Sequence, residues 1–160
     1  MRFVIPNRFF SVGLFLFLVL FSVLLISCSV QDEIAVDNAW IPEAPPSVSA
    51  QAGYLDIANH FSNTMVLSGA ESPFFDHIVL HKTVVDKETD FARMIEQPSI
   101  SIKAGQTLKL EPGGYHLMLI TPRQGMSSGA LVPITLLFEN GYQKRVDFEV
   151  KPFRLHLESS

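Results

Sequence analysis

The stretch Glu111-Pro-Gly-Gly-Tyr-His-Leu-Met-Leu-Ile120 joins a turn to an apolar run that has the pattern of a buried strand. The Pro-Gly-Gly at 112–114 is a strong turn signal, and a strand that follows it is expected to present its first residues at the edge of a sheet. Successive side chains of a strand point to opposite faces, so His116 and Met118 share one face. They form a pair of soft metal ligands, although both residue types also pack in cores without any such role.

Alternating apolar and polar residues recur in short segments along the chain. Val146, Phe148 and Val150 alternate with charged residues after Asn140-Gly141, a dipeptide typical of a hairpin turn. Similar patterns predict strands at residues 53–59, 65–70, 76–85, 107–111, 115–121 and 131–138. Short strands separated by frequent turn signals predict an all-β fold, an antiparallel β-sandwich or barrel.

Residues 87–96 allow two interpretations. Phe91, Met94 and Ile95 have helical spacing in a segment rich in helix-forming residues, which predicts a short helix. The alternative is a charged hairpin loop at residues 86–90, followed by a strand that begins at Phe91.

The N-terminal part has the pattern of an export signal. Arg2 and Arg8 precede an uncharged apolar run at residues 12–26, which is short for a membrane span and typical of a secretory signal. The run ends in Leu-Ile-Ser-Cys at residues 25–28, which resembles a bacterial lipobox, so cleavage would leave a lipidated Cys28 at the N-terminus. The alternative is an uncleaved membrane anchor.

These signals divide the chain into parts. Residues 1–27 are expected to be a lipoprotein signal peptide, 28–35 a polar tether, 36–152 the folded domain and 153–160 a C-terminal tail. Within the domain, residues 98–104 are expected to connect two strands. Ser29 after the cysteine, in place of Asp, favours the outer membrane by analogy with lipoprotein sorting in Gram-negative bacteria.

Cysteine content and charge exclude several functions. Cys28 is the only cysteine of the chain, so the exported domain is expected to lack thiol catalysis, a cysteine zinc site and a blue-copper thiolate. Loss of Arg2 and Arg8 with the leader changes the formal net charge from -4 to -6, and an acidic domain without a basic run is a poor candidate for nucleic acid. The usual catalytic motifs are absent as well, so an enzyme is not expected.

Four residues follow one another in the order of a known metal-binding signature. His81, Met94 and the pair His116-x-Met118, with twenty-one residues between Met94 and His116, resemble the signature of the PCu(A)C family of periplasmic copper chaperones. Further runs that resemble the family are Ala39-Trp40, Ala52-Gly-Tyr54, Ala70-Glu-Ser-Pro73, Val79-Leu-His81 and Val132-Pro-Ile-Thr-Leu-Leu-Phe-Glu139. The resemblance covers residues 36–150.

The resemblance implies both a fold and a function. The fold would be a cupredoxin-like β-sandwich or Greek-key barrel, and the segment after residue 86 would be the hairpin. His81, Met94, His116 and Met118 would bind Cu(I), because thioether sulfur favours this soft ion and imidazole serves it as well. The protein would then be a lipid-anchored periplasmic chaperone that delivers copper to an acceptor such as a respiratory oxidase subunit or its assembly factor.

The sequence departs from the family pattern at two points. Twelve residues separate His81 from Met94, where the pattern has ten, and a longer hairpin tip would absorb the difference. Lys82 stands where Met or Glu is more usual, and would place a cation beside the metal. Two other functions remain open: a structural or protein-interaction lipoprotein without metal, and redox catalysis by bound copper. His77 is expected to lie too far along its strand, about 13 Å from His81, to share one ion with it.

Overall fold

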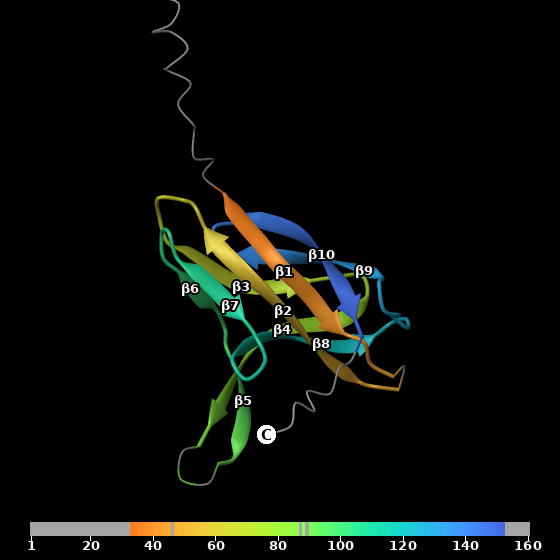
Figure 1. The fold of residues 1–160 in the computed structure, drawn as a ribbon. Helices are drawn as coiled ribbons and strands as arrows, with labels where there is room; N and C mark the ends of the chain where they lie inside the picture. The colour runs from red at the N-terminus through yellow and green to blue at the C-terminus, as the bar shows by residue number, and fades with distance from the viewer. Residues whose placement is uncertain (1–32, 46, 87, 89, 153–160) are drawn as a thin grey trace, which may run out of the picture. The chain divides into compact units, whose positions relative to one another are not determined.

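Ten β-strands and no helix form the part of the chain that the computed structural model describes, residues 33–45, 47–86, 88 and 90–152 (Figure 1). The strands are β1 (Ile34–Pro42), β2 (Ala50–Asn59), β3 (Met65–Glu71), β4 (Phe75–Val85), β5 (Ala92–Glu96), β6 (Ile100–Ile102), β7 (Thr107–Leu110), β8 (Tyr115–Pro122), β9 (Leu131–Phe138) and β10 (Gln143–Lys151). The predicted all-β class is therefore confirmed. The predicted signal peptide, Cys28 and the C-terminal tail lie outside the described residues. Within those residues, no helix has the length and apolar character that a membrane span requires.

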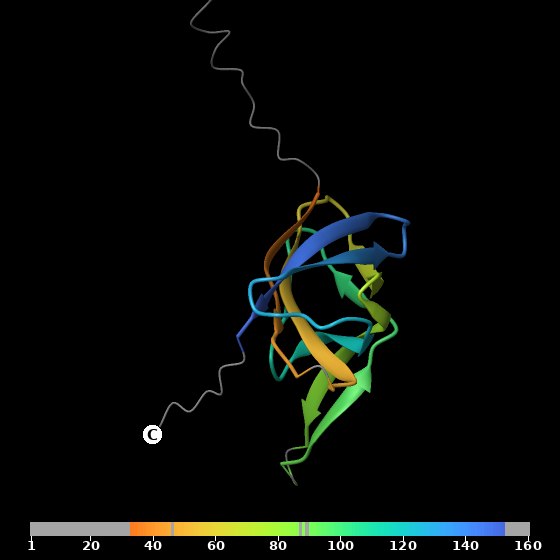
Figure 2. The ribbon, with the colours of Figure 1, turned by 90° about the vertical axis from the view of Figure 1, so that its right-hand side faces the viewer.

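All ten strands belong to one hydrogen-bonded sheet. Their order is β5-β4-β8-β7-β2-β1-β10-β9-β3-β6, and β8 also pairs with β2. The sheet curls into a barrel-like sandwich, because β3 and β4, which lie near opposite ends of this order, contact each other (Figures 1 and 2).

Two strand pairs differ from the predicted antiparallel arrangement. β1 pairs with β10 and β7 pairs with β8 in parallel, whereas the other pairs are antiparallel. β1 and β10 come from opposite ends of the domain, so no short turn has to join them and they are free to run in the same direction. The sheet is therefore mixed.

The core forms where the apolar faces of the strands meet. Leu80 on β4 and Leu117 and Leu119 on β8 are buried, as are Phe148 and Val150 on β10. Each group keeps the period of two that its strand imposes, so the alternation in the sequence correctly indicates the inward face. Burial of these side chains provides the main favourable contribution to folding.

Two segments contribute more to the fold than their sequence indicates. β1 begins at Ile34, two residues before the predicted start of the domain, and Ile34 is fully buried opposite Asn59 of β2. The predicted connector at 98–104 contains β6, whose Ile100 and Ile102 are buried where β6 pairs with β3. Three residues are too few to establish a period, so only tertiary pairing shows that β6 is a strand.

The ambiguous segment after Val85 forms a hairpin, and the helical interpretation is wrong. β5 pairs with β4 in antiparallel register, and the Asp86 N–H donates a hydrogen bond to the Phe91 carbonyl at the mouth of the loop. All five residues of β5 are exposed. Figure 1 shows the β4–β5 hairpin extending from the rest of the domain. The apolar side chains at helical spacing therefore do not pack into the core, and hydrogen bonding to β4 determines the structure of this segment.

Candidate metal centre

β8 carries two of the four predicted ligands and lies inside the sheet. Its neighbours are β4 on one side and β2 with β7 on the other, so the predicted placement at a sheet edge is wrong. His116 is only 4% exposed and is one of two buried polar residues in the described part of the chain. Met118 is partly buried between Val79 of β4 and Ala52 of β2, which stand opposite it. The Pro-Gly-Gly turn at 112–114 precedes β8, but pairing with strands distant in the sequence determines that β8 lies in the interior of the sheet.

His81 of β4 stands directly opposite His116 of β8. Their ring centroids are 5.8 Å apart, and the ring planes meet at 81°. Directly opposite residues of an antiparallel pair point to the same face, so the two imidazoles form one cross-strand pair. This face lies opposite the one that carries the buried core residues Leu80 and Leu117.

The hydrogen bonds of the two rings leave nitrogen atoms free to bind a metal. Nδ1 of His116 lies 3.2 Å from the carbonyl oxygen of Gly114, and a carbonyl can only accept, so Nδ1 carries the proton and donates it. The lone pair of His116 is therefore on Nε2. Nδ1 of His81 is buried and has no hydrogen-bond partner among the described residues. A buried nitrogen without a partner is costly, and a bound metal ion would remove that cost.

The environment of His116 favours the neutral, metal-binding form of its ring. Burial lowers the pKa of His116, and repulsion by His81 lowers it further, while the hydrogen bond to Gly114 acts in the opposite direction. Imidazole binds metal ions only when it is deprotonated, so a lowered pKa favours the form of His116 that can act as a ligand.

Met94 lies on β5 opposite Thr83 of β4 and on the same face of the sheet as His81. Its side chain is 62% exposed. The loop between β4 and β5 spans residues 86–91. The two residues by which the His81–Met94 spacing exceeds the family pattern can be accommodated in this loop, so they do not prevent Met94 from pairing with Thr83.

Lys82 does not stand beside the four predicted ligands, despite its position next to His81 in the sequence. It points to the opposite face of β4, where its Nζ lies 4.8 Å from the centroid of the Tyr115 ring. The alternation of side chains along β4 places Lys82 on the face opposite His81, and attraction to the Tyr115 ring stabilises its ammonium group there.

The sheet thus places all four predicted ligands on one face. His81 and His116 are in contact, while Met94 lies further toward the hairpin tip and Met118 further along β8 in the other direction. No group of three or more His, Cys, Asp or Glu side chains is gathered as a metal site in the described part of the chain. Cys28, the predicted lipidation site, lies outside the described residues.

Sequence reasoning missed two groups at this face. Glu96 stands directly opposite His81 on β5, and the Gly114 carbonyl determines the tautomer of His116. The hairpin register would have identified Glu96 once the loop length was known, because each residue of β5 then has a fixed partner on β4. The role of Gly114 has no sequence signal beyond its position two residues before His116.

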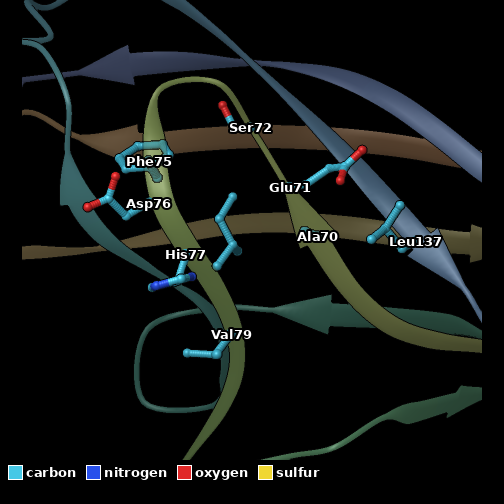
Figure 3. Close-up of a pocket in the computed structure, with 9 residues that line it drawn as sticks. Ala70, Glu71, Ser72, Phe75, Asp76, His77, Val79 and Leu137 are labelled. Atoms are coloured by element: carbon cyan, nitrogen blue, oxygen red, sulfur yellow. The ribbon is translucent and has the colours of Figure 1, made fainter.

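A separate cavity of about 370 Å³ lies beside β3 and β4. Figure 3 shows Asp76 and His77 on one side of it, with Glu71 and Leu137 on the other. None of the four predicted ligands lines it. His77 is exposed and stands opposite Ile120, four residues along β4 from His81.

Comparison with known proteins identifies relatives of the whole domain. The family model described as "Putative lipoprotein LpqE-like" matches residues 34–150. A relative from Leifsonia xyli subsp. xyli (strain CTCB07), "Putative lipoprotein Lxx21020", is 32% identical over 122 residues, which cover 76% of this chain and 72% of that protein.

Solved structures that share this fold include PCuAC domains. "Solution structure of CuI-DR1885 from Deinococcus Radiodurans" has a TM-score of 0.62 and 25% identity, and the match covers 81% of this chain and 85% of that one. "Copper-bound PCuAC domain from PmoF2" has a TM-score of 0.64 and covers 78% of this chain and 97% of that one, and at 18% identity it shows the fold alone. The chain belongs to the LpqE-like family, and its domain has the PCuAC fold.

Proposed function

We propose that this protein is an extracytoplasmic, lipid-anchored copper chaperone that binds one Cu(I) ion as cargo. The observation that carries the proposal is the contact between His81 and His116, on a face that also holds Met94 and Met118. The buried Nδ1 of His81, which lacks a hydrogen-bond partner, supports a ligand role for this ring. The solved relative at 25% identity is named as a Cu(I) form, which agrees with this choice of ion.

The chemistry of these four residues suits Cu(I). Two thioethers and two imidazoles are neutral donors, and thioether sulfur selects the soft Cu(I) ion over zinc or magnesium. Such a site requires no thiolate, which would be prone to oxidation outside the cytoplasm. The exposure of Met94 leaves one side of the site accessible to an acceptor protein.

The test is a titration of residues 31–160, which contain the whole described core, with Cu(I) under anaerobic conditions against a competing chelator. We expect a stoichiometry of one Cu(I), and no displacement by zinc or magnesium at equal concentration. A stoichiometry of zero would reject the proposal.

A second candidate is a protein-interaction lipoprotein without metal. Val85, Phe91, Met94 and Ile95, all in the β4–β5 hairpin, are four of the five exposed large apolar residues of the described part of the chain. Gathered apolar side chains of this kind mark interaction surfaces. This candidate replaces the first if the protein binds no Cu(I).

The proposed location is the periplasmic side of a membrane, with the outer membrane favoured by Ser29 after Cys28. The leader pattern and the lipoprotein name of the relative support it. We expect Cys28→Ser in the full chain to move the protein from the membrane to the soluble fraction. Unchanged membrane retention would instead indicate an uncleaved anchor.

The proposed acceptor is a respiratory oxidase copper centre or a protein that assembles it. This part of the proposal rests on the resemblance to the PCu(A)C family. Transfer of Cu(I) from the loaded protein to a purified oxidase copper-binding domain, followed by the absorbance of that domain, is the corresponding test.

A further inference from the structure

The consecutive strands β3 and β4 are joined by a short turn, but they are not paired with each other in the described part of the chain. β6 pairs with β3 only up to Leu67, and β5 pairs with β4 only from His81 onward. The residues nearest the turn, 69–71 of β3 and 75–79 of β4, therefore each have one edge that faces no described strand. Figure 3 shows the two strands diverging from the turn at Ser72, so the sheet is open between them.

The cavity of about 370 Å³ lies in this opening. The connection from β5 to β6 bounds the opening at the end away from the turn, where the Gln97 N–H donates a 2.8 Å hydrogen bond to the Leu80 carbonyl oxygen. Ala70 and Phe75, both buried, line the cavity together with the partly buried Ile78. An apolar cavity beside two free strand edges is the arrangement that accepts an added strand.

The residues that follow β10 have the alternation of a strand. Apolar and polar residues alternate from Phe153 to Glu158, in the order Phe-Arg-Leu-His-Leu-Glu. A strand of this pattern has one apolar face and one polar face. Inserted beside β3, it would turn the apolar face to the cavity and the polar face to solvent. The edge of β5 offers no such burial, because all five residues of β5 are exposed.

The end of β10 lies within reach of the opening. Arg145 of β10 is opposite Thr135 of β9, and Thr135 is opposite Glu71 of β3. Lys151 is six residues beyond Arg145, so Glu71 lies about 10 Å across two strand spacings and about 20 Å along the sheet from Lys151, or about 22 Å in all. Residues 152–160 span about 30 Å when extended, which covers this distance. Their attachment to β10 also gives them a high effective concentration at the opening.

We propose that residues 153–158 of this chain insert between β3 and β4 as an additional strand and close the sheet. The strand would run antiparallel to β3 and cover the apolar residues that line the cavity. This closure does not depend on copper binding, so it is tested on the metal-free protein.

Disulfide cross-linking tests the position of the segment. Residues 31–160 contain no cysteine, so Glu71→Cys can be combined with one further cysteine on the polar face of the segment, by Arg154→Cys, His156→Cys or Glu158→Cys. Side chains on one face of adjacent strands are about 5 Å apart, so at least one of the three pairs should form an intramolecular disulfide under mild oxidation. The matched control replaces Glu71→Cys by Glu139→Cys, an exposed position in the β9–β10 connection, and should form none.

Hydrogen exchange tests whether the segment pairs with the free edges. Residues 31–152 keep the ten described strands, and their amides that face the opening, within 69–71 and 75–79, should exchange about tenfold faster than in residues 31–160. Leu155→Ser combined with Leu157→Ser should have the same effect as the truncation. His156→Ser, on the polar face, should leave exchange unchanged.

Two results would overturn the proposal. One is the absence of a cross-link to Glu71→Cys at all three positions. The other is equal exchange of the opening amides with and without residues 153–160. If the segment instead protects the amides of β5, the proposal is also wrong, and β5 is the edge that the segment occupies.

Discussion

β8 and β5 each carry part of the proposed copper site, and their environments differ strongly. β8 lies inside the sheet, where Leu117 and Leu119 are fully buried on one face and His116 is nearly buried on the other. β5 is an edge strand, all of whose residues are exposed, including Met94 at 62%. One part of the site is therefore continuous with the core, and the other is attached to it through β4 alone.

Because of this difference, substitutions on the two strands are expected to affect folding stability and copper binding to different extents. Substitutions on β8 change packing as well as copper binding, because its side chains contact the core on one face and the site on the other. Substitutions on β5 remove no buried contact, so their effects on copper binding can be measured in a folded protein. An exposed ligand is also easier for an acceptor protein to replace than a buried one.

The largest expected effect is on stability. Leu117→Ala should lower the free energy of unfolding of metal-free residues 31–160 by about 2–5 kcal/mol, because it leaves a cavity in the core. Ile95→Ala on β5 should lower it by less than about 1 kcal/mol. Urea denaturation measures both values. Equal losses for the two variants would show that β5 is as much part of the core as β8.

The second effect is on copper binding and tests the exposed part of the site. Met94→Leu should weaken Cu(I) binding by about tenfold or more, since a lost ligand should cost no less than a lost outer-shell partner. The free energy of unfolding should change by less than about 1.5 kcal/mol, because Leu and Met have similar volumes. Anaerobic Cu(I) titration and urea denaturation give the two numbers.

The control for this prediction is His116→Ala, which should also weaken Cu(I) binding. If Met94→Leu keeps full Cu(I) affinity while His116→Ala loses it, Met94 is not a ligand. The site would then consist of His81, His116 and Met118.

The third effect is a pH dependence that comes from the buried part of the site. Burial lowers the pKa of His116 in the folded protein, so as pH falls the unfolded chain takes up this proton first, near its usual pKa of about 6.5. The stability that neutral His116 contributes is therefore fully present above pH of about 6.5 and is lost as pH falls from there to the lower folded pKa.

Urea denaturation of the metal-free protein between about pH 5 and 8 measures this dependence. His116→Gln should remove this part of the slope, while His60→Gln, at an exposed position, should keep it. A slope that is the same in wild type and His116→Gln would contradict the assignment.

The smallest expected effect is at Lys82. Its ammonium group packs on Tyr115 on the face opposite the site, so Lys82→Gln should change Cu(I) affinity by no more than about twofold. A larger increase in affinity, measured in the same titration, would mean that the cation does reach the metal.

The sequence by itself determined the local features of this protein. The alternation around β4, β8 and β10 correctly indicated strands and separated their two faces, because the period of two is a property of each strand alone, and the apolar run at β9 correctly indicated a strand. The order of His81, Met94, His116 and Met118 likewise indicated a soft donor set before any geometry was known. The sequence did not predict β6 or the first residues of β1. Both segments are too short to show a period of two.

Only the tertiary structure decided which residues meet. The pairing of His81 with His116, the interior position of β8 and the placement of Glu96 opposite His81 all follow from strand register across long sequence separations. The segment around Met94 shows the same principle, since its sequence favours a helix while hydrogen bonding to β4 makes it a strand. Periodicity states which way a side chain points, but its neighbour on the next strand depends on hydrogen bonding and burial over the whole sheet.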